Sequence, residues 1–501
     1  MKMIYNFIEV GDYMNLSKSK YCNGIQCKKM LWLDENRSEY KERITNESIF
    51  DNGNDVHEVA RKLLGDDINI KFNENLGEMI KDTKKALVNE NVIITEASFV
   101  YNNNFCSVDI LKKEGNNYEM YEVKSSTHLK EVFINDLSYQ YYVLTQLGFN
   151  VVKAYVVIID SSYIRCGNLE LDKLFKKIDC TDKVIKLKNI VKNNIQMINE
   201  YMDNKTEPND DIGNHCFEPY NCPFFNYCTR KIKKPNVFNI RLMSNKKKIE
   251  LYKNNIYSYK DLLKEKINDK YKQQIEFELY DKPDYIDKNN IKKFLNTLSY
   301  PLYFLDFETF QMSIPKYDGV KPYMQIPFQY SLHYYDVDNN LNHKEFLAQA
   351  DIDPRRKLAE QLVKDIPKNV CVLAYNMSFE KTVIKNLASL YPDLSKSLMN
   401  IYDNIKDLMI PFKSRDYYTK NMHGSYSIKY VLPALFPDDP SLDYHNLELV
   451  HNGSEAMDIY ANLGKKSKEE QSIIRKNLLK YCYLDTYAMV KIYDKLIEIV
   501  K

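Results

Sequence analysis

The chain has 501 residues, more than one hydrophobic core usually spans, so two or three domains are expected. Its 71 Lys and Arg nearly balance its 69 Asp and Glu, which excludes a strong overall field that would attract nucleic acid or membrane. Any basic surface must therefore be local. Glu9 and Asp12 interrupt the apolar N-terminal stretch, and nothing later approaches the ~18 apolar residues of a spanning helix, so we expect a soluble cytoplasmic protein with no membrane partner.

The ten cysteines are expected to be reduced core residues or metal ligands, as in most long cytosolic chains. Cys216, Cys222 and Cys228 form an evenly spaced ladder, and Cys22 and Cys27 lie far upstream. Paired zinc thiolates usually lie two to four residues apart, so the wider spacing favours an iron-sulfur cluster over zinc. The alternative is ordinary core packing, which we predict for the other five: Cys106, Cys166, Cys180, Cys371 and Cys482.

Two alternating strands flank a predicted Gly/Asn turn at residues 115–116. If these two residues form the loop, Asp109 faces Glu122, and a loop one residue later sets Asp109 opposite Lys124. Either register brings the three side chains to one sheet face. Two carboxylates can hold Mg²⁺ or Mn²⁺ and the lysine can stabilise an attacked phosphate, although a solvated salt-bridge patch is the alternative. Upstream, His57 would add a ligand.

The runs SVDI and YEVKSS, followed by YQYYVL, resemble the RecB-type nuclease core of the PD-(D/E)XK superfamily. The motifs occur in order and extend over about residues 15–230. The resemblance implies a restriction-endonuclease-like core in which His57, Asp109 and Glu122 bind metal, Lys124 is the catalytic lysine, and Gln140 lies on the following helix.

The cysteines resemble the iron-sulfur staple of CRISPR-associated and helicase-nuclease members of the same superfamily. The family context SKSxYxxGxQCxKxLW matches Cys27, which leaves Cys22 as a bystander. The resemblance implies a 4Fe-4S cluster bound by Cys27, Cys216, Cys222 and Cys228. The cluster would be structural, because its ligands join the start of the domain to its far end.

Residues 231–297 are rich in lysine, with apolar residues at helical spacing in IELYKNNIYSYKDLL. The simpler interpretation is a solvated helical linker. The alternative is a small helical module that holds phosphates, because clustered Lys with interleaved Tyr suits backbone contact and base stacking.

The run YPLYFLDFETF has the composition of a strand. Its alternation places Leu305 and Phe307 on one face and Asp306 and Glu308 on the other. Two acids at this spacing can bind one ion or bridge two, although exposed acids on an edge strand are the alternative. The pair needs partners from elsewhere in the chain.

Two later segments offer such partners. NVCVLAYNMSFEK predicts a buried strand, a turn containing Asn376, and a helix from Ser378 with Glu380 in its first turn. LLKYCYLDTYAMV predicts an amphipathic helix with Tyr481 and Asp485 four residues apart on one face. Taken separately, each is compatible with an ordinary helix.

The order of these three motifs resembles the Tyr-containing branch of the DEDD exonucleases, which are RNase H-like. The resemblance implies two divalent ions held by Asp306, Glu308, Glu380 and Asp485, with Tyr481 orienting the attacking water. The family's middle acid is usually Asp, so Glu380 leaves a shifted or single-metal site open. HGSYSIKYVLPALFP resembles the substrate-side helix of this branch, where His423, Ser427 and Lys429 would face nucleic acid.

Together these features predict a multi-domain α/β protein that resembles a bacterial fusion family. A RecB-like domain over residues 1–230 and a module over 231–297 would precede an RNase H-like domain over 298–501, with a mixed sheet and flanking helices. We expect a nuclease with two active sites that acts on DNA ends or single strands, 3′-to-5′ at the C-terminal site. The alternatives are an RNA-processing exoribonuclease and a nucleic-acid-binding subunit of a repair or defence complex with one degenerate site.

Overall fold

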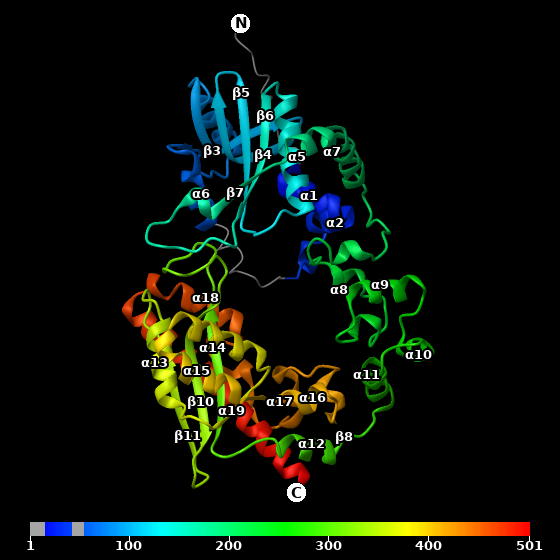
Figure 1. Cartoon of the computed structure of the whole chain (residues 1–501). Helices are drawn as coiled ribbons and strands as arrows, with labels where there is room; N and C mark the ends of the chain where they lie inside the picture. The colour runs from blue at the N-terminus through cyan, green and yellow to red at the C-terminus, as the bar shows by residue number, and fades with distance from the viewer. Residues whose placement is uncertain (1–15, 43–54) are drawn as a thin grey trace. The chain divides into compact units, whose positions relative to one another are not determined.

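The computed structural model describes residues 16–42 and 55–501, which divide into two compact units (Figure 1). One unit contains the described residues up to Ile232 together with Met312–Tyr323, and the other contains Lys233–Gln311 and Met324–Lys501. Both units combine helices with a sheet, which confirms the prediction of a mixed α/β protein. Within the described ranges, no helix combines the length and the apolar character needed to cross a membrane.

The first unit is built on a seven-stranded sheet in the order β2-β3-β4-β5-β6-β7, with β1 beside β4. Its strands are β1 (Leu16–Ser17), β2 (Ile68–Asn69), β3 (Asn91–Tyr101), β4 (Asn104–Glu114), β5 (Asn117–Lys124), β6 (Asn150–Ile159) and β7 (Phe175–Asp179). Its α-helices include α1 (Lys18–Gln26), α2 (Lys28–Asn36), α4 (Leu76–Ala86), α5 (Glu131–Gln146), α6 (Leu171–Leu174), α7 (Thr181–Met202) and α8 (Phe225–Cys228). Figure 1 shows α5 against the sheet, and α7 packs on α5.

The β4–β5 hairpin has the first of the two predicted registers. The turn lies at residues 115–116, and Ile110 pairs with Tyr121. The ladder stops there, because the Asp109 carboxylate accepts the backbone N–H of Val123 at 2.7 Å. A side chain thus replaces a ladder hydrogen bond and separates the two strands at the position of the predicted site.

The second unit contains a five-stranded sheet in the order β11-β10-β9-β12-β13. Strands β9, β10 and β11 are antiparallel, and β12 and β13 run parallel to β9. The strands of this unit are β8 (Tyr285–Ile286), β9 (Leu302–Phe310), β10 (Ile326–Tyr335), β11 (Leu341–Leu347), β12 (Cys371–Ala374), β13 (Ile405–Asp407) and β14 (Tyr417–Tyr418). Its sheet helices are α13 (Arg355–Asp365), α14 (Ser378–Leu390), α15 (Pro392–Asn404), α18 (Gly453–Ala461) and α19 (Lys468–Val500).

Strand β9 has the predicted alternation. Leu305 and Phe307 pack in the core that α13, α14 and α15 form over one sheet face. Helix α19 covers the other face, where the Phe304 ring lies 5.7 Å from that of Tyr493. The acids of β9 therefore lie on the sheet face that α19 covers, with Glu308 buried and Asp306 partly buried.

The Lys-rich segment forms the predicted helices, and the structure packs them into the second unit. These are α9 (Asn245–Lys253), α10 (Tyr259–Leu262), α11 (Asp269–Tyr280) and α12 (Lys288–Leu295). Helices α9, α10 and α11 share a small apolar core that includes Ile240, Leu251 and Ile275. Strand β8 pairs with β14, and α12 contacts α19 and α16 (Ile410–Lys413), so this segment is anchored to the C-terminal residues.

Candidate metal-binding sites

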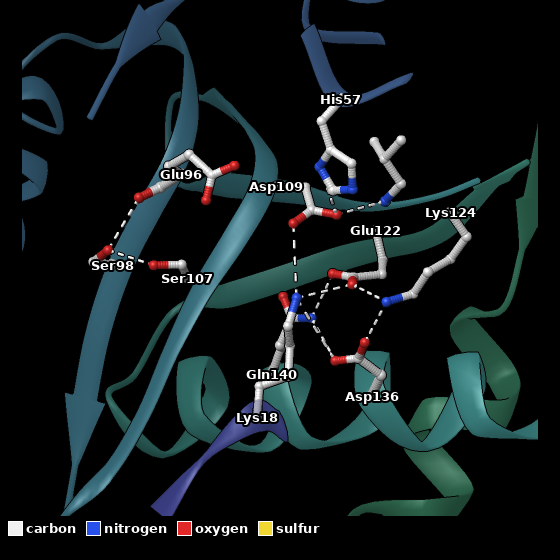
Figure 2. Close-up of polar contacts among 11 residues, drawn as sticks. Lys18, His57, Glu96, Ser98, Ser107, Asp109, Glu122, Lys124, Asp136 and Gln140 are labelled. Carbon is white, nitrogen blue, oxygen red and sulfur yellow. Dashed lines mark hydrogen bonds and ion pairs between the residues drawn. The ribbon is translucent and has the colours of Figure 1, made fainter. Parts of the chain in front are cut away.

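The first acid cluster lies where β4 and β5 separate (Figure 2). Glu122 is fully buried on β5, and Gln140 on α5 donates to its Oε2 at 2.6 Å. Lys124 Nζ lies 2.6 Å from Glu122 Oε1 and 2.5 Å from Asp136 Oδ2. Asp136 and Gln140 are four residues apart, on the helix face that packs on the sheet. The cluster thus unites the predicted Asp109, Glu122, Lys124 and Gln140 and adds Asp136.

A possible set of metal ligands lies at one side of this cluster. One ligand atom each from His57, Glu96 and Asp109 lies within 4.8 Å of the others. His57, in a helical segment at residues 55–60, places Nδ1 3.9 Å from Asp109 Oδ2. The sequence motifs did not indicate Glu96. Burial, and then the charge of Asp109, raise the pKa of its carboxyl to about 7. Such a carboxyl is well suited to a cation that would compensate its charge.

Lys18 lies between the carboxylates of the first cluster. Its Nζ is 2.9 Å from Glu122 Oε1, 3.7 Å from Asp109 Oδ1 and 3.8 Å from Asp136 Oδ1. Burial lowers the pKa of Lys18, but these three carboxylates outweigh it and hold that pKa well above its usual value. Lys18 is the first residue of α1, whose N-cap is Ser17, so its ammonium is placed by the start of a helix. The chain thereby supplies its own cation to the acids.

Replacing Lys18 with Met is expected to destabilise the metal-free protein by about 3 kcal/mol, because three carboxylates lose a shared, mostly buried partner. Urea unfolding in EDTA would measure the change. Lys20→Met is the matched control: its partner Glu35 is partly exposed, so a loss below about 1 kcal/mol is expected. An unchanged urea midpoint for Lys18→Met would contradict the role given to Lys18.

The four predicted cluster cysteines are electrostatic neighbours of one another. Burial, and then the charges of Cys27, Cys216 and Cys228, raise the pKa of the Cys222 thiol to about 12. Burial, and then the charge of Asp136, raise the pKa of the Cys22 thiol to about 12. Cys22 therefore lies near the first acid cluster. This is the division of the two upstream cysteines that the sequence favours.

Hydrogen bonds join the two cysteine segments. Gln26, beside Cys27, donates through Nε2 to the carbonyl oxygens of His215 at 2.8 Å and Tyr220 at 2.7 Å. Within residues 16–42 and 55–501, no three of the four thiols have sulfur atoms within 4.8 Å of one another. A tetrahedral zinc site with Zn–S bonds of about 2.3 Å would need sulfurs closer than that. In this structure the described thiols are therefore not gathered as a tetrahedral zinc ion would gather them.

The second acid cluster joins β9 to α19. Asp306, Glu308 and Asp485 each offer a carboxylate oxygen within 4.8 Å of the others. Burial raises the pKa of Asp306 well above its usual value, and the charges of Asp485 and Glu308 raise it further. Tyr444 donates to Asp485 Oδ1 at 2.6 Å. The ring of Tyr481 lies beside that of Tyr444, with their centroids 5.9 Å apart. Three carboxylates this close repel one another unless a cation or protons intervene.

Glu380 lies near this cluster but outside the set of three. It sits in the first turn of α14, which begins at Ser378 as predicted. Its Oε2 is buried and has no hydrogen-bond partner among the described residues. Burial raises the pKa of Glu380 to about 8, and Asp407 contributes in the same direction. Asp407, which the motifs did not indicate, accepts the N–H groups of Asn376 and Met409, each at 3.0 Å.

The raised pKa values predict that the metal-free protein loses stability as pH rises. Burial raises the pKa of Asp485 to about 6, and that of Glu380 is raised to about 8. Acids with raised pKa bind protons more tightly when folded, so their contribution is complete below about pH 4 and is lost as pH rises through these values. Thermal unfolding in EDTA should show a falling midpoint between about pH 6 and pH 8.

Glu380→Gln should flatten the upper part of that pH profile, since glutamine stays neutral. Adding Mn²⁺ near pH 8 should restore the wild-type midpoint, because the ion replaces the missing protons. A variant profile that matches the wild-type slope would show that Glu380 is not the group that titrates.

A pocket of about 920 Å³ adjoins the second cluster. Tyr444, which bonds Asp485, lies in its wall with Lys429 and Phe436. Burial raises the pKa values of Glu308 and Asp485, and the positive charge of Lys429 lowers both. The Lys429 ammonium is therefore close enough to act on these acids. Of the three residues predicted on the substrate-side helix, Lys429 thus lines this pocket and His423 lines a different one. Ser427 stands at the N-cap position of helix α17 (Ile428–Leu435), where its side chain makes no capping hydrogen bond.

Comparison with known proteins adds little about activity. A family model described as a domain of unknown function, DUF2779, matches residues 303–427. The matched segment contains Asp306, Glu308 and Glu380 but ends before Tyr481 and Asp485. No curated protein matches the chain. The functional conclusion therefore rests on the two sites themselves.

Proposed function

We propose that the protein is a metal-dependent nuclease with two active sites that hydrolyses phosphodiester bonds at DNA ends or in single strands. The observation that carries the proposal is the second cluster: three carboxylates from β9 and α19 within 4.8 Å, one buried and two partly buried, beside a pocket that a lysine also lines. Oxygen ligands at this spacing suit Mg²⁺ or Mn²⁺. A bound ion would lower the pKa of water and stabilise charge on the attacked phosphate.

At the C-terminal site, we assign metal binding to Asp306, Glu308 and Asp485, with Glu380 as a fourth acid near them. Tyr444 fixes the Asp485 carboxylate by its hydrogen bond, and Tyr481 lies one helical turn before Asp485 and would orient the attacking water. Lys429 would neutralise the scissile phosphate. The pocket would hold the end of a strand, and the proposed polarity there is 3′-to-5′.

At the N-terminal site, we assign metal binding to His57, Glu96 and Asp109, with Glu122 close by. Lys124, held by Glu122 and Asp136, would stabilise charge on the attacked phosphate, and Gln140 would keep Glu122 in place. We assign a 4Fe-4S cluster to Cys27, Cys216, Cys222 and Cys228, because the other three thiols are electrostatic neighbours of Cys222 and the wide sequence spacing suits a group larger than one ion.

One observation favours a second candidate. Glu380 lies outside the set of three acids, so the C-terminal site would lack a full two-metal ligand set. In that case the C-terminal unit would bind nucleic acid within a repair or defence complex, and only the N-terminal site would cleave. The two candidates differ in whether Asp306 matters for cleavage.

The test is cleavage of single- and double-stranded DNA and matched RNA, labelled at either end, with Mn²⁺. Lys124→Ala and Asp306→Ala are each expected to remove one of two product patterns, with 3′-end shortening lost in Asp306→Ala. Lys112→Ala and Asp494→Ala are matched controls, since both side chains lie outside the clusters. The proposal fails if both site variants keep all wild-type cleavage, and faster cleavage of RNA would reassign the substrate.

A further inference from the structure

A second pocket in the C-terminal unit is lined mainly by basic side chains. Its volume is about 460 Å³. The lining residues are Lys234, Pro235, Asn239, Arg241, Glu278, Lys420 and His423. It combines residues of the Lys-rich segment with the turn that precedes α17, and neither acid cluster contributes to it. Its charge is therefore unexplained by the two proposed metal sites.

Arg241 is held in a fixed position at this pocket. Its guanidinium carbon lies 4.7 Å from the centroid of the Tyr430 ring, and the guanidinium also donates to the Tyr430 hydroxyl. Its backbone N–H donates to Gln274 Oε1 at 3.0 Å. Stacking on an aromatic ring orients a guanidinium and leaves its remaining N–H groups for a ligand.

The positive charge of Lys234 and Arg241 is not neutralised within the described part of the chain, where neither has a carboxylate partner within ion-pair distance. Two acids partner the other basic residues of the pocket. Asp281 pairs with Lys420 at 2.7 Å, and Glu278 Oε1 lies 3.8 Å from His423 Nδ1 while Glu278 Oε2 accepts from Tyr259 at 3.0 Å. Glu278 also accepts from Gln274. The pocket thus keeps an excess of positive charge.

The pocket wall is closely built. Gly424 has φ +77, and a Cβ at that position would meet Gln274 Oε1 at 2.2 Å and Arg241 Cβ at 3.2 Å. A larger residue would push the turn away from Arg241, so this wall depends on the glycine. Such close packing is expected of a pocket that holds its cations in place.

Helix α17 connects this pocket with the acid cluster. Tyr430 contacts Arg241 at the basic pocket. The preceding residue, Lys429, lines the other pocket, the one of about 920 Å³ that adjoins Asp485 and Glu308. A strand whose end lies at the acids would therefore pass close to Arg241. Phosphate oxygens are the ligands that an oriented guanidinium and a nearby ammonium bind best.

We propose that the pocket formed by Lys234, Arg241, Lys420 and His423 binds a backbone phosphate of the single DNA strand whose end is cleaved at the C-terminal acids. The inference rests on the proposed function for the identity of its ligand. It assigns the Lys-rich segment a binding role upstream of the cleaved bond, and it makes Arg241 a binding residue with no part in the reaction.

The test measures binding without cleavage. Fluorescence anisotropy of a labelled oligothymidylate of about 15 nucleotides is recorded with the full chain in EDTA, over a series of salt concentrations. Lys234→Ala/Arg241→Ala is expected to weaken binding about 10-fold or more, and the slope of log affinity against log salt should shrink by about 0.7, the value for one lost phosphate contact on a single strand. A purely structural defect would not change that slope in this way.

Lys246→Ala/Lys253→Ala is the matched control, since it removes the same charge from exposed positions of α9, outside the pocket. The proposal is overturned if the pocket variant binds as the wild type does, if the control loses as much, or if the wild type does not bind the strand. Arg241→Lys separates the effects of charge and stacking and should give an intermediate affinity. Because no metal is present, these outcomes are independent of whether Asp306→Ala abolishes cleavage.

Discussion

Asp306→Asn is expected to reduce 3′-end cleavage on the order of 10³-fold or more while making the metal-free protein more stable. The loss of activity follows from the position of Asp306, whose carboxylate is one of three that converge between β9 and α19. Asparagine keeps the shape but brings no charge, so a divalent ion would bind weakly. Cleavage of a 5′-labelled single strand with Mn²⁺ measures this half of the prediction.

The gain in stability follows from the same geometry. Burial and the charges of Asp485 and Glu308 raise the pKa of Asp306, so ionisation of this group opposes folding near neutral pH. Asparagine removes one of the repelling charges. We expect a gain of about 1 kcal/mol, or about 2–4 °C in Tm, when unfolding is followed in EDTA near pH 8.

Asp494→Asn is the control for both halves, because Asp494 also lies on α19 but accepts from the Tyr335 hydroxyl at 2.9 Å, away from the acids. It should leave cleavage unchanged and give no gain in Tm. Mn²⁺ should stabilise the wild type and have little effect on Asp306→Asn. A drop in the Tm of metal-free Asp306→Asn would show that repulsion among these acids is not what limits stability.

The parts that could be predicted from the sequence depend on local rules. The Gly/Asn turn at residues 115–116 left two hairpin registers open that share one face, and the structure has the first of them. The alternation in β9 separated the core residue Leu305 from the acid Asp306, and the structure places them on opposite faces. In both cases the period of the backbone decides which side chains share a face.

The residues that the sequence did not reveal reach their sites from separate segments. Lys18 meets Glu122 across 104 positions of chain, and only folding brings α1 to the sheet. Glu96 lies at a break in the β3–β4 pairing, with φ +57, and strand periodicity gives no signal for such a break. Tyr444 comes from a segment of short turns, where side-chain direction follows from packing alone. Non-local contacts of this kind carry no sequence period.

The same limit applies to the Lys-rich segment. Its helical spacing predicted α9 and its neighbours, but composition left open whether they form a linker or a module. The structure pairs β8 with β14 and places the Phe277 ring 4.9 Å from that of Tyr418. These contacts give the segment a fixed place on the C-terminal unit, which is what a phosphate pocket that includes Lys420 requires.

Cys222→Ser is expected to remove the brown colour of an iron-sulfur protein and most of the soluble yield. The physical reason is loop closure: Gln26, beside Cys27, bonds His215, which lies 189 positions away and beside Cys216. A cluster bound to both segments would hold this long loop closed and stabilise the fold by several kcal/mol. Iron content per chain and visible absorbance after anaerobic purification measure the effect.

Cys22→Ser is the matched control, because the surroundings of Cys22 are Asp136, Lys124 and Lys18, and not the other thiols. It should keep full iron and full colour, whereas Cys27→Ser should lose both, since Cys27 neighbours Cys222. If Cys222→Ser retained its iron, the cluster assignment would be wrong. Zinc in place of iron in the wild type would also contradict it.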